Sequence, residues 1–588
     1  MSIMESFRTE VEDAVKKALS ETGADVQFTI EVPPADAPAD LAVPCFPMSK
    51  ALRKAPKDIA EDLAGKISPG GLISEVNAAN GYLNFRMNGQ ELINGTLKDV
   101  LTCGPMYGSL PYKNKKIIVE HTSTNPTGPI HVGRARNPII GDTLARALKM
   151  CGYDVTTEYY VNDVGKQVVI LTWGVNNLSK EEVEEDVRKR EMEDDRDKTD
   201  HKLVAYYRLA NVKMESDPKV QEEIQDMLRR FEAGDEQVIS TVRKTAEVML
   251  DGLKESLRNI DVVLDTYTWE SKFIADGSAK KYVEQLKASE YAGQDDNGAC
   301  YLELKDFGIQ GKNTRFTFTR SDGTTLYTTR DIAYHQDKFS RADILVDVLG
   351  EDQKLGNKQL CCALEILGQT RKLEAMFYSF VSLPEGKMST RKGVVVYLDD
   401  LIDEAISRAY EEIKSRRSAP GDCMSEERMR EIARIIGVGA IRYNIVRVQP
   451  EKQLVFKWED ALNFDGNSGP FLQYSYARAC SMLRKAGEFK EVVDASLLKD
   501  EYELNLVKTI SRFENVIEEA GEKKRIHLLP AYGHELASAF NQFYAFVPVL
   551  NAKDTKDTKD ARLTLVKCAK IVLGNVLECL GMGAPEEM

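Results

Sequence analysis

Residues 115–167 read KKIIVEHTSTNPTGPIHVGRARNPIIGDTLARALKMCGYDVTTEYYVNDVGKQ. An apolar run at 117–119 precedes a polar loop, and apolar residues then recur at helical spacing over 140–151. A helix-stopping glycine follows, and residues 155–161 are β-prone again. This order predicts a βαβ unit of a doubly wound, nucleotide-binding parallel sheet.

Three residues of the polar loop suit a phosphate ligand. In a βαβ unit the ligand lies beyond the carboxyl end of the first strand, where free N–H groups and the helix dipole favour negative charge. His131, Gly133 and Arg134 lie at this place. Gly133 allows close approach of the backbone, and Arg134 can donate two hydrogen bonds to one phosphate. The alternative is a histidine that only caps the helix and a glycine that only packs.

A second motif, KMSTRKG at residues 387–393, lies between β-prone stretches at 376–381 and 394–397. Together the two motifs resemble the paired His-x-Gly-His and Lys-Met-Ser-Lys-Ser signatures of class I aminoacyl-tRNA synthetases. Within this class the sequence is similar to the arginyl-tRNA synthetase family. The similarity runs nearly end to end and includes residues 40–44, 125–129, 322–324, 330–331, 469–470 and 477–478.

The resemblance implies ATP-dependent ligation of L-arginine to tRNA(Arg) for protein synthesis. The arginine carboxylate would attack the α-phosphorus of ATP, which enters with Mg²⁺, and would form arginyl-adenylate and pyrophosphate. A terminal ribose hydroxyl of the tRNA would then take the arginyl group and release AMP. Such chemistry depends on positioning and on neutralising charge rather than on a protein nucleophile.

The resemblance also implies roles for individual residues. The catalytic set is His131, Gly133, Arg134, Lys387, Met388, Ser389 and Arg391. The ATP-binding set is Pro126, Thr127, Gly128, His131, Val132, Gly133, Lys387 and Ser389. The arginine-binding set is Glu120, Ser123, Asn125, Tyr327, Asp331 and Asp352. The tRNA-binding set is Tyr474, Tyr476 and Arg478. No metal ligand is expected from protein side chains.

The acidic residues suit arginine because a carboxylate can pair with a guanidinium in a planar, bidentate way. Tyr327 and Asp331 are four residues apart, so a helix presents both on one face. The alternative is a buried structural pair of tyrosine and aspartate.

The two signatures are incomplete. The second histidine of the first is Arg134, and the second lysine of the other is Thr390. Family members without the full lysine signature often carry a compensating lysine before the first motif, where this chain has Gly128 and Pro129. Phosphate charge would then be neutralised by one or more of four cations, namely Arg134, Lys387, Arg391 and Lys392.

Two other functions are compatible with these motifs. A class I synthetase for another amino acid would need a different side-chain site: glutamate requires cationic contacts, and cysteine recognition uses zinc thiolates. A synthetase-like RNA-binding protein without catalysis is suggested by Arg134 and Thr390. Retention of His131, Lys387 and Ser389 favours the enzyme.

Composition limits the class of protein. The formal charge of −14 argues against nonspecific nucleic-acid binding by the whole surface, so an RNA partner would meet local basic patches. The ten cysteines form no Cys-x-x-Cys pair, which predicts reduced thiols and no structural zinc. No apolar stretch reaches the ~18 residues of a membrane span, and the N-terminus is charged. We expect a cytoplasmic monomer.

At 588 residues the chain should form three or four domains of roughly 150 residues each. We expect an α/β protein whose doubly wound, Rossmann-like catalytic domain is joined to an N-terminal α+β domain and a C-terminal all-α bundle. The expected boundaries are 1–110 for the N-terminal domain, 111–174 and 300–415 for the catalytic domain, 175–299 for a helical insertion and 416–588 for the anticodon-binding domain.

The N-terminal domain resembles one that contacts the tRNA elbow, and Lys50, Arg53, Lys54 and Lys57 supply basic surface. A dimerisation or packing module is the alternative. Local patterns add four expectations: a strand at 26–32, a strand of the main sheet at 315–320, one helix at 501–520 and a loop at 553–560.

Overall fold

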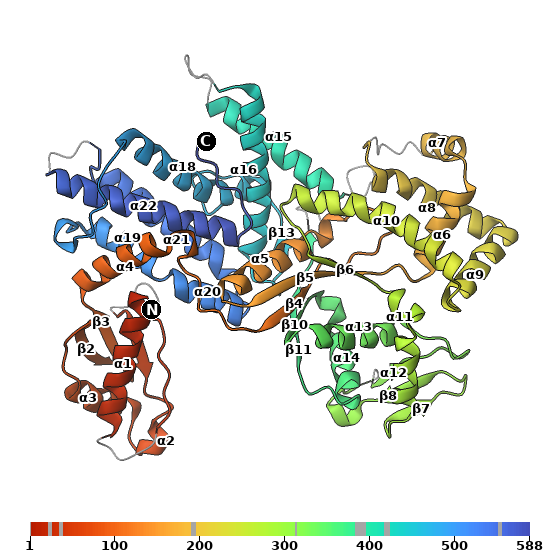
Figure 1. The fold of residues 1–588 in the computed structure, drawn as a ribbon, viewed down its shortest axis with the longest axis horizontal. Helices are drawn as coiled ribbons and strands as arrows, with labels where there is room; N and C mark the ends of the chain where they lie inside the picture. The colour runs from red at the N-terminus through yellow and green to blue at the C-terminus, as the bar shows by residue number, and fades with distance from the viewer. Residues whose placement is uncertain are drawn as a thin grey trace.

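The computed structural model describes residues 2–20, 26–33, 39–189, 196–311, 314–382, 396–416, 424–550 and 555–588. A central parallel sheet separates an N-terminal α+β part and a C-terminal helical part from a mostly helical insertion (Figure 1).

The central sheet has five parallel strands in the order β11-β10-β4-β5-β6. Their bounds are β4 Lys116–Glu120, β5 Asp154–Val161, β6 Thr266–Trp269, β10 Ile344–Gly350 and β11 Leu373–Tyr378. The strand order reverses between β4 and β10, which is the arrangement of a doubly wound sheet. The predicted βαβ unit and the predicted fold class are therefore confirmed.

The two faces of this sheet carry different helices. Successive side chains of a strand point to opposite faces, and Ile117 and Val119 pack into the core that includes α5, Arg136–Met150. Ile118 packs instead into the core of α13, Tyr327–Arg341, and α14, Lys354–Ile366. The sheet is thus covered on both faces.

A row of carboxylates crosses the α13 face of the sheet. Asp347, Glu120 and Glu158 are register partners on the adjacent strands β10, β4 and β5. Lys338 of α13 pairs with Asp347 and Glu120, and Arg341 pairs with Glu158 through two hydrogen bonds of 2.7 and 2.9 Å. Three carboxylates buried between a sheet and a helix are stabilised only with cations opposite them, so this row fixes the position of α13.

The N-terminal part is an antiparallel sheet, β1-β3-β2, packed against helices. Its elements are α1 Ile3–Ser20, β1 Leu41–Pro44, α2 Ser49–Leu52, α3 Pro56–Lys66, β2 Ile73–Ala79, β3 Tyr82–Met87, α4 Gly89–Cys103 and the 3₁₀ turn η1 Gly104–Met106. The predicted strand at 26–32 is wrong. Its alternate residues are partly buried as expected, but only Glu31 forms a β-bridge, to Ala42.

The segment between β5 and α13 is mostly helical and also contains strands. Its elements are α6 Lys166–Asn177, α7 Lys180–Lys189, α8 Thr199–Ser216, α9 Pro218–Glu232, α10 Glu236–Asn259, β6, α11 Lys272–Ala275, α12 Ser278–Lys287, β7 Ala292–Gln294, β8 Cys300–Glu303, η3 Lys305–Phe307 and β9 Arg315–Thr317. The expectation that 315–320 continues the main sheet is wrong. β9 pairs antiparallel with β8 in a separate sheet, because Phe316 and Leu302 pack over the α13 side of the domain.

The C-terminal part is almost wholly helical. Its elements are α15 Leu398–Arg416, α16 Glu426–Val446, β13 Leu454–Val455, α17 Trp458–Ala461, α18 Gly469–Ala486, η5 Ala495–Leu497, α19 Glu501–Ser511, α20 Phe513–Glu522, α21 Leu528–Phe546 and α22 Lys556–Cys579. Three short elements belong to the central part of the chain instead, η2 Val132–Arg134, η4 Glu351–Gln353 and β12 Val381–Ser382. The helix predicted at 501–520 is two helices that meet at Arg512.

The loop predicted at 553–560 is also partly wrong. Thr555 caps α22, accepting a hydrogen bond from the Thr558 N–H at 3.3 Å, so residues 556–560 form the first turn of that helix. A repetitive, charged composition suggested a loop, whereas the cap and an acidic first turn favour a helix. Residues 553–554 lie outside the described part of the chain.

The C-terminal helices dock on α5 through a buried ion pair. Asp142 of α5 pairs with Arg442 of α16, whose guanidinium also donates to the carbonyl oxygens of Leu580 and Ile260 at 2.7 and 2.8 Å. Arg146 contacts the same carboxylate oxygen of Asp142, Oδ2, at 2.8 Å. Asp142 and Arg442 together therefore join α5, α16 and the end of α22.

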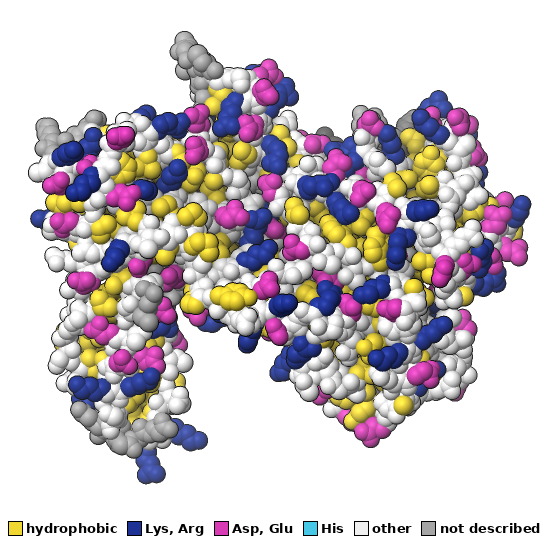
Figure 2. Space-filling model, in the orientation of Figure 1, with side chains coloured by type: hydrophobic (Ala, Val, Ile, Leu, Met, Phe, Trp, Pro, Cys, Tyr) yellow, Lys and Arg dark blue, Asp and Glu magenta, His cyan; other side chains and the backbone are white. Residues whose placement is uncertain are grey.

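Both charge signs are interspersed over the visible face of the molecule (Figure 2). The exposed residues Lys50, Arg53, Lys54 and Lys57 lie on and beside α2, at the end of the N-terminal part where Figure 2 shows Lys and Arg side chains. Among the described residues, no helix is long and apolar enough to cross a membrane.

Asp142→Asn should strongly destabilise the protein, because it leaves the Arg442 guanidinium buried without an opposite charge. The expected loss is about 3 kcal/mol, the scale of a broken buried pair. It should appear as a lower urea midpoint of unfolding. As a control, Asp62→Asn removes an exposed pair with Lys54 and should leave the midpoint unchanged. Equal midpoints for both variants would contradict the role of Asp142.

Candidate active site

The described residues of the predicted ATP and arginine sets lie around the switch point of the sheet. Glu120 ends β4, and Gly350 ends the neighbouring strand β10. In doubly wound sheets the ligand lies in the crevice outside these carboxyl ends. Residues 121–131 leave β4 here and lead to η2 and α5.

The first residues of this loop have strained backbone. Thr122 has φ 73° and Ser123 has φ 36°, values that non-glycine and especially β-branched residues rarely adopt. The Ser123 N–H donates to the His121 carbonyl at 3.0 Å, which closes a γ-turn at Thr122. Asn137 of α5 holds the turn by accepting from the Thr122 N–H at 2.7 Å. Strain of this kind concentrates at ligand sites.

The turn directs the Ser123 hydroxyl into the acidic end of the site. Ser123 Oγ donates to Glu120 Oε1 at 3.1 Å and accepts from the Tyr160 N–H at 3.1 Å. The hydroxyls of Tyr160 and Tyr334, whose rings stack at 4.0 Å, are buried without a hydrogen-bond partner in the described chain. The hydroxyls of Tyr160 and Tyr334 are thus two hydrogen-bond donors close enough to Glu120 to interact with its charge.

His131 has a defined proton. It caps η2, and its Nδ1 accepts from the Gly133 N–H at 3.1 Å. Because Nδ1 is the acceptor, the neutral imidazole carries its proton on Nε2, which becomes the donor. His131 therefore caps η2 through Nδ1, and this contact leaves Nε2 able to donate to a phosphate, so both interpretations stay open.

The other described members of the predicted ATP set, and Arg134 of the catalytic set, lie on the same loop or in η2. Pro126, Val132 and Gly133 are buried, Thr127 and Gly128 are partly exposed, and Arg134 is exposed.

The second signature lies outside the described residues. This applies to Lys387, Met388, Ser389 and Arg391, and to Thr390 and Lys392. The residues that flank it lie beside the first motif, because the Val132 N–H donates to the Val396 carbonyl at 3.0 Å and the Leu398 N–H donates to the Ile130 carbonyl at 2.7 Å.

A buried charge cluster holds the start of α15. Lys198 donates to Asp200 at 3.1 Å and to Asp399 at 3.0 Å, and His201 contacts Asp399 at 2.9 Å. Burial raises the pKa of Asp399, but His201 and Lys198 outweigh it and lower this pKa to about 2. The insertion helix α8 thereby positions the chain that follows the second signature.

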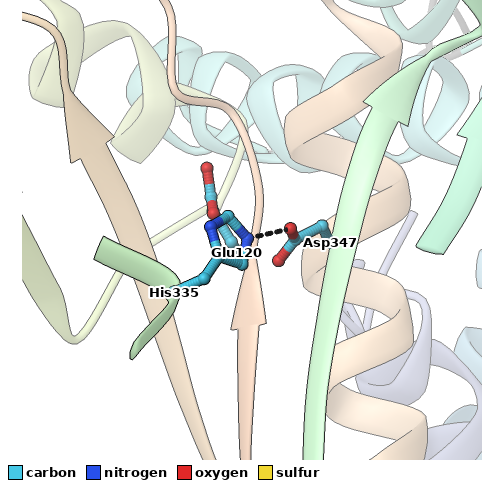
Figure 3. A group of neighbouring side chains, drawn as sticks. All are labelled: Glu120, His335 and Asp347. Atoms are coloured by element: carbon cyan, nitrogen blue, oxygen red, sulfur yellow. Dashed lines mark hydrogen bonds and ion pairs between the residues drawn. The ribbon is translucent and has the colours of Figure 1, made fainter. Parts of the chain in front are cut away.

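Glu120 belongs to a second buried cluster. Lys338 Nζ lies 2.6 Å from Glu120 Oε2 and 2.8 Å from Asp347 Oδ1. His335 Nε2 lies 2.8 Å from Asp347 Oδ2, and its Nδ1 lies 3.1 Å from Asp331 Oδ1. Figure 3 shows Glu120, His335 and Asp347 directed toward one another from β4, α13 and β10.

The remaining predicted arginine ligands border this cluster. Tyr327 is 68% exposed at the start of α13, and the Asp331 side chain, one turn later, is 37% exposed. Asn125 and Asp352 are exposed on the loops that follow β4 and β10. The set therefore lies at one end of the sheet, with Glu120 at its base.

The cluster controls its own protonation. Burial raises the pKa of Glu120. Burial also opposes ionisation of Asp347, but Lys338 and His335 lower its pKa to about 2. Burial and Lys338 disfavour the imidazolium of His335, yet Asp331 and Asp347 raise its pKa to about 10. Lys338, His335 and Asp347 are all charged at neutral pH.

The sequence analysis missed His335, Lys338 and Asp347. A signal for each was present: His335 and Lys338 follow Asp331 by four and seven residues, on its helix face. Asp347 is a lone carboxylate in the apolar strand ILVDVLG. A polar residue inside an otherwise apolar buried strand indicates a partner nearby.

Two groups of acidic and histidine side chains in the described residues are close enough to hold a metal, Glu120–His335–Asp347 and Asp200–His201–Asp399. In both groups a lysine ammonium already contacts two carboxylates, Lys338 in the first and Lys198 in the second. Neither group therefore fits a divalent ion.

The predicted tRNA residues lie on α18. The guanidinium of Arg478 stacks between the rings of Tyr474 and Tyr544 at 4.7 and 4.6 Å from their centroids. These residues line an open groove, and Tyr474 is 38% exposed. Tyr476 lies on another face of α18, packed against Gly574 of α22.

Comparisons with known proteins agree over the whole chain. Residues 96–458 match the family described as tRNA synthetases class I (R), catalytic domain. Residues 472–588 match the DALR anticodon binding domain, and residues 5–87 match the arginyl tRNA synthetase N terminal domain. The fold and site are thus those of a class I tRNA synthetase.

Individual relatives narrow the assignment. The arginine–tRNA ligase of Methanocella arvoryzae is 44% identical over 98% of each chain, and that of Methanothermobacter thermautotrophicus is 39% identical over 98% of this chain and 99% of its own. The Thermus thermophilus arginyl-tRNA synthetase structure superimposes with a TM-score of 0.82 at 28% identity, covering 99% of this chain and 100% of its own. The chain belongs to the arginyl-tRNA synthetase family.

The charged state of His335 predicts a pH dependence of stability. Its pKa is raised from 6.5 to about 10 by Asp331 and Asp347, with Lys338 and Glu120 also facing it. The stabilisation is therefore complete below pH 6.5 and is lost as the pH rises to about 10. The melting temperature of the wild type should fall over this range more than that of His335→Gln.

His527→Gln is the matched control for this measurement. Burial lowers the pKa of His527, so the stabilisation that its neutral ring contributes is lost as the pH falls, which is opposite to the expectation for His335. A difference in melting temperature between wild type and His335→Gln that stays constant from pH 6.5 to 10 would contradict a charged His335.

Proposed function

We propose that the protein is an arginine–tRNA ligase that forms arginyl-adenylate from L-arginine and ATP and transfers the arginyl group to tRNA(Arg). The observation that carries this proposal is the acidic end of the site, where Glu120 and Asp331 lie at the switch point of a nucleotide-binding sheet. Two carboxylates in partly desolvated positions favour a guanidinium. The named arginine ligases among its relatives support the same substrate.

Another amino acid suits this site less well. A glutamate site would direct cations at the substrate side chain, but Lys338 and His335 are both engaged by carboxylates. Charging of total tRNA by the purified protein, measured with each amino acid in turn, tests the proposal. Charging with arginine alone is expected, and charging with another amino acid or with none would overturn it.

Each set of predicted residues receives a role in this proposal. Ser123 and Asn125 would hold the backbone groups of arginine, and Glu120, Tyr327 and Asp331 would line its side-chain site, with Asp352 nearby. The loop around His131 would bind ATP through the residues given above, and Lys387, Met388, Ser389 and Arg391 would complete the phosphate site. ATP would enter as its Mg²⁺ complex.

The adenylation step follows from charge. The arginine carboxylate attacks the α-phosphorus, the bond to the bridging oxygen breaks, and pyrophosphate leaves with its electron pair. His131 Nε2 and the exposed Arg134 would stabilise the developing charge on the phosphate oxygens. No protein nucleophile is needed.

The tRNA would bind both helical and N-terminal parts. Tyr474 and Arg478 present a stacking surface suited to unpaired bases, as single-stranded RNA is usually recognised. The exposed basic residues of α2 and its surroundings would contact the phosphates of the tRNA elbow. We propose that the domains have the boundaries given in the sequence analysis and carry these roles. We also propose that the protein is a cytoplasmic monomer.

His131→Ala should lower kcat for arginine charging by roughly 100-fold, the effect of one lost transition-state donor. The Kd for tRNA should change less, since His131 lies at η2 in the crevice of the sheet, whereas the proposed RNA contacts lie on α18 and around α2. Steady-state charging and filter binding measure the two quantities. Arg134→His restores the usual signature and should retain activity. Wild-type kcat in His131→Ala would remove His131 from the phosphate site.

Pyrophosphate exchange should require tRNA. Members of this family generally activate their amino acid only with tRNA bound, and the second signature here lacks a lysine at Thr390. A phosphate site with one cation fewer stabilises bound triphosphate less, so bound tRNA would supply the missing contribution to the active state. Exchange with arginine and ATP alone should be negligible and should appear on addition of tRNA. Strong exchange without tRNA would contradict this coupling.

A further inference from the structure

Asp347 connects two residues of the proposed arginine site. Through His335 it reaches Asp331, with distances of 2.8 Å from Asp347 to Nε2 and 3.1 Å from Nδ1 to Asp331. Through Lys338 it reaches Glu120, with distances of 2.8 and 2.6 Å. The two carboxylates that face the substrate therefore share one buried partner.

Each link in this network is directional. His335 Nε2 faces Asp347 (Figure 3), and its Nδ1 hydrogen-bonds the Asp331 backbone carbonyl at 2.8 Å with the Asp331 carboxylate 3.1 Å away, so the ring plane is fixed at both nitrogens. Lys338 is fully buried and donates to Glu120 and Asp347, which are register partners on adjacent strands. The Ser123 hydroxyl contacts the other oxygen of Glu120. The Glu120 carboxylate is thus held from two sides.

Stability of the fold does not by itself require ionisable side chains at these positions. Replacing a buried ion pair by apolar side chains of similar size is often neutral or stabilising. The neighbours of Asp347 on β10 are apolar, and Leu345, two residues away on the same face, packs in an ordinary hydrophobic core. Buried ionisable groups beside a ligand crevice are characteristic of functional sites.

The composition of the cluster suits one guanidinium. Three carboxylates, on Glu120, Asp331 and Asp347, face the two cationic side chains of Lys338 and His335, so the carboxylates outnumber the cations by one. A substrate side chain with one positive charge would supply the missing partner.

We infer that Asp347 is a positioning residue for arginine binding, which acts through His335 on Asp331 and through Lys338 on Glu120. The inference rests on the proposed function and deepens it. Selectivity for a guanidinium is then set partly by residues that do not touch the substrate.

Asp347→Asn in the full chain tests the inference under saturating tRNA. The KM for arginine should rise about 10- to 100-fold, because both carboxylates lose their orientation, while the KM for ATP should stay within about 2-fold. The effect of the double variant Asp331→Asn/Asp347→Asn should be smaller than the product of the two single effects, because Asp347 acts in part through Asp331, while its branch to Glu120 is still lost.

A second variant covers the case in which Asp347→Asn does not fold. His335→Gln is neutral, breaks only the branch to Asp331 and should raise the KM for arginine about 10-fold, again without changing that for ATP. The matched control is Asp337→Asn. Asp337 lies on the same helix but pairs with Lys272 and Arg341 outside the cluster, so its removal should leave both KM values unchanged.

The outcomes separate the inference from the proposed function. A wild type that does not charge tRNA with arginine would overturn both. A wild type that does so, with an unchanged arginine KM in His335→Gln or Asp347→Asn, would overturn only the inference. Equal increases in the KM for arginine and ATP, or multiplicative effects in the double variant, would also overturn it, since both indicate general damage.

Discussion

Three carboxylates in one row across three parallel strands determine how the catalytic part is built. Asp347, Glu120 and Glu158 are neighbours in register, and their side chains share the face that α13 covers. Desolvated carboxylates without cations would be strongly destabilising, so α13 can pack only where Lys338 and Arg341 reach them. This requirement fixes the helix along its axis and about it. The first turn of α13, which carries Tyr327 and Asp331, is thereby placed at the crevice, and the geometry of the site follows from the interaction that closes the core.

On the opposite face of the sheet, α5 is held in place by one buried arginine. Arg136, at the start of α5, is fully buried, and its guanidinium donates to the carbonyl oxygens of Ser379, Val448, Gln449 and Lys452 at 2.6 to 3.0 Å. Burial lowers its pKa to about 10, yet carbonyl oxygens from two segments, Ser379 and residues 448–452, accept from both terminal nitrogens of the guanidinium. One side chain thus joins the helix after the first signature, the strand end before the second signature and the connection into the C-terminal helices.

Much of this arrangement could be predicted from sequence, and the failures have physical causes. The strands β4 and β5 followed from an apolar run and a β-prone stretch, and the helix α5 followed from apolar residues at helical spacing. The strand at 26–32 failed because alternation reports which residues are buried, whereas hydrogen-bond pairing depends on the partner chain. The prediction for β9 was wrong because the sequence of a short strand does not indicate which sheet the strand joins. His335, Lys338 and Asp347 were missed because their roles arise from pairing between β4, β10 and α13, which are distant in sequence.

The loop after β4 is held by hydrogen bonds from both faces of the sheet. Asn137 of α5 holds the Thr122 N–H and donates to the Val348 carbonyl of β10, so the loop is tied to the Arg136 side of the sheet. Ser123, one residue later, contacts Glu120 and is tied to the α13 side. A loop held from both faces cannot relax its positive φ angles at either residue without releasing one of them. The strained turn therefore keeps the proposed phosphate and guanidinium sites at a fixed separation, which a reaction between bound arginine and ATP requires.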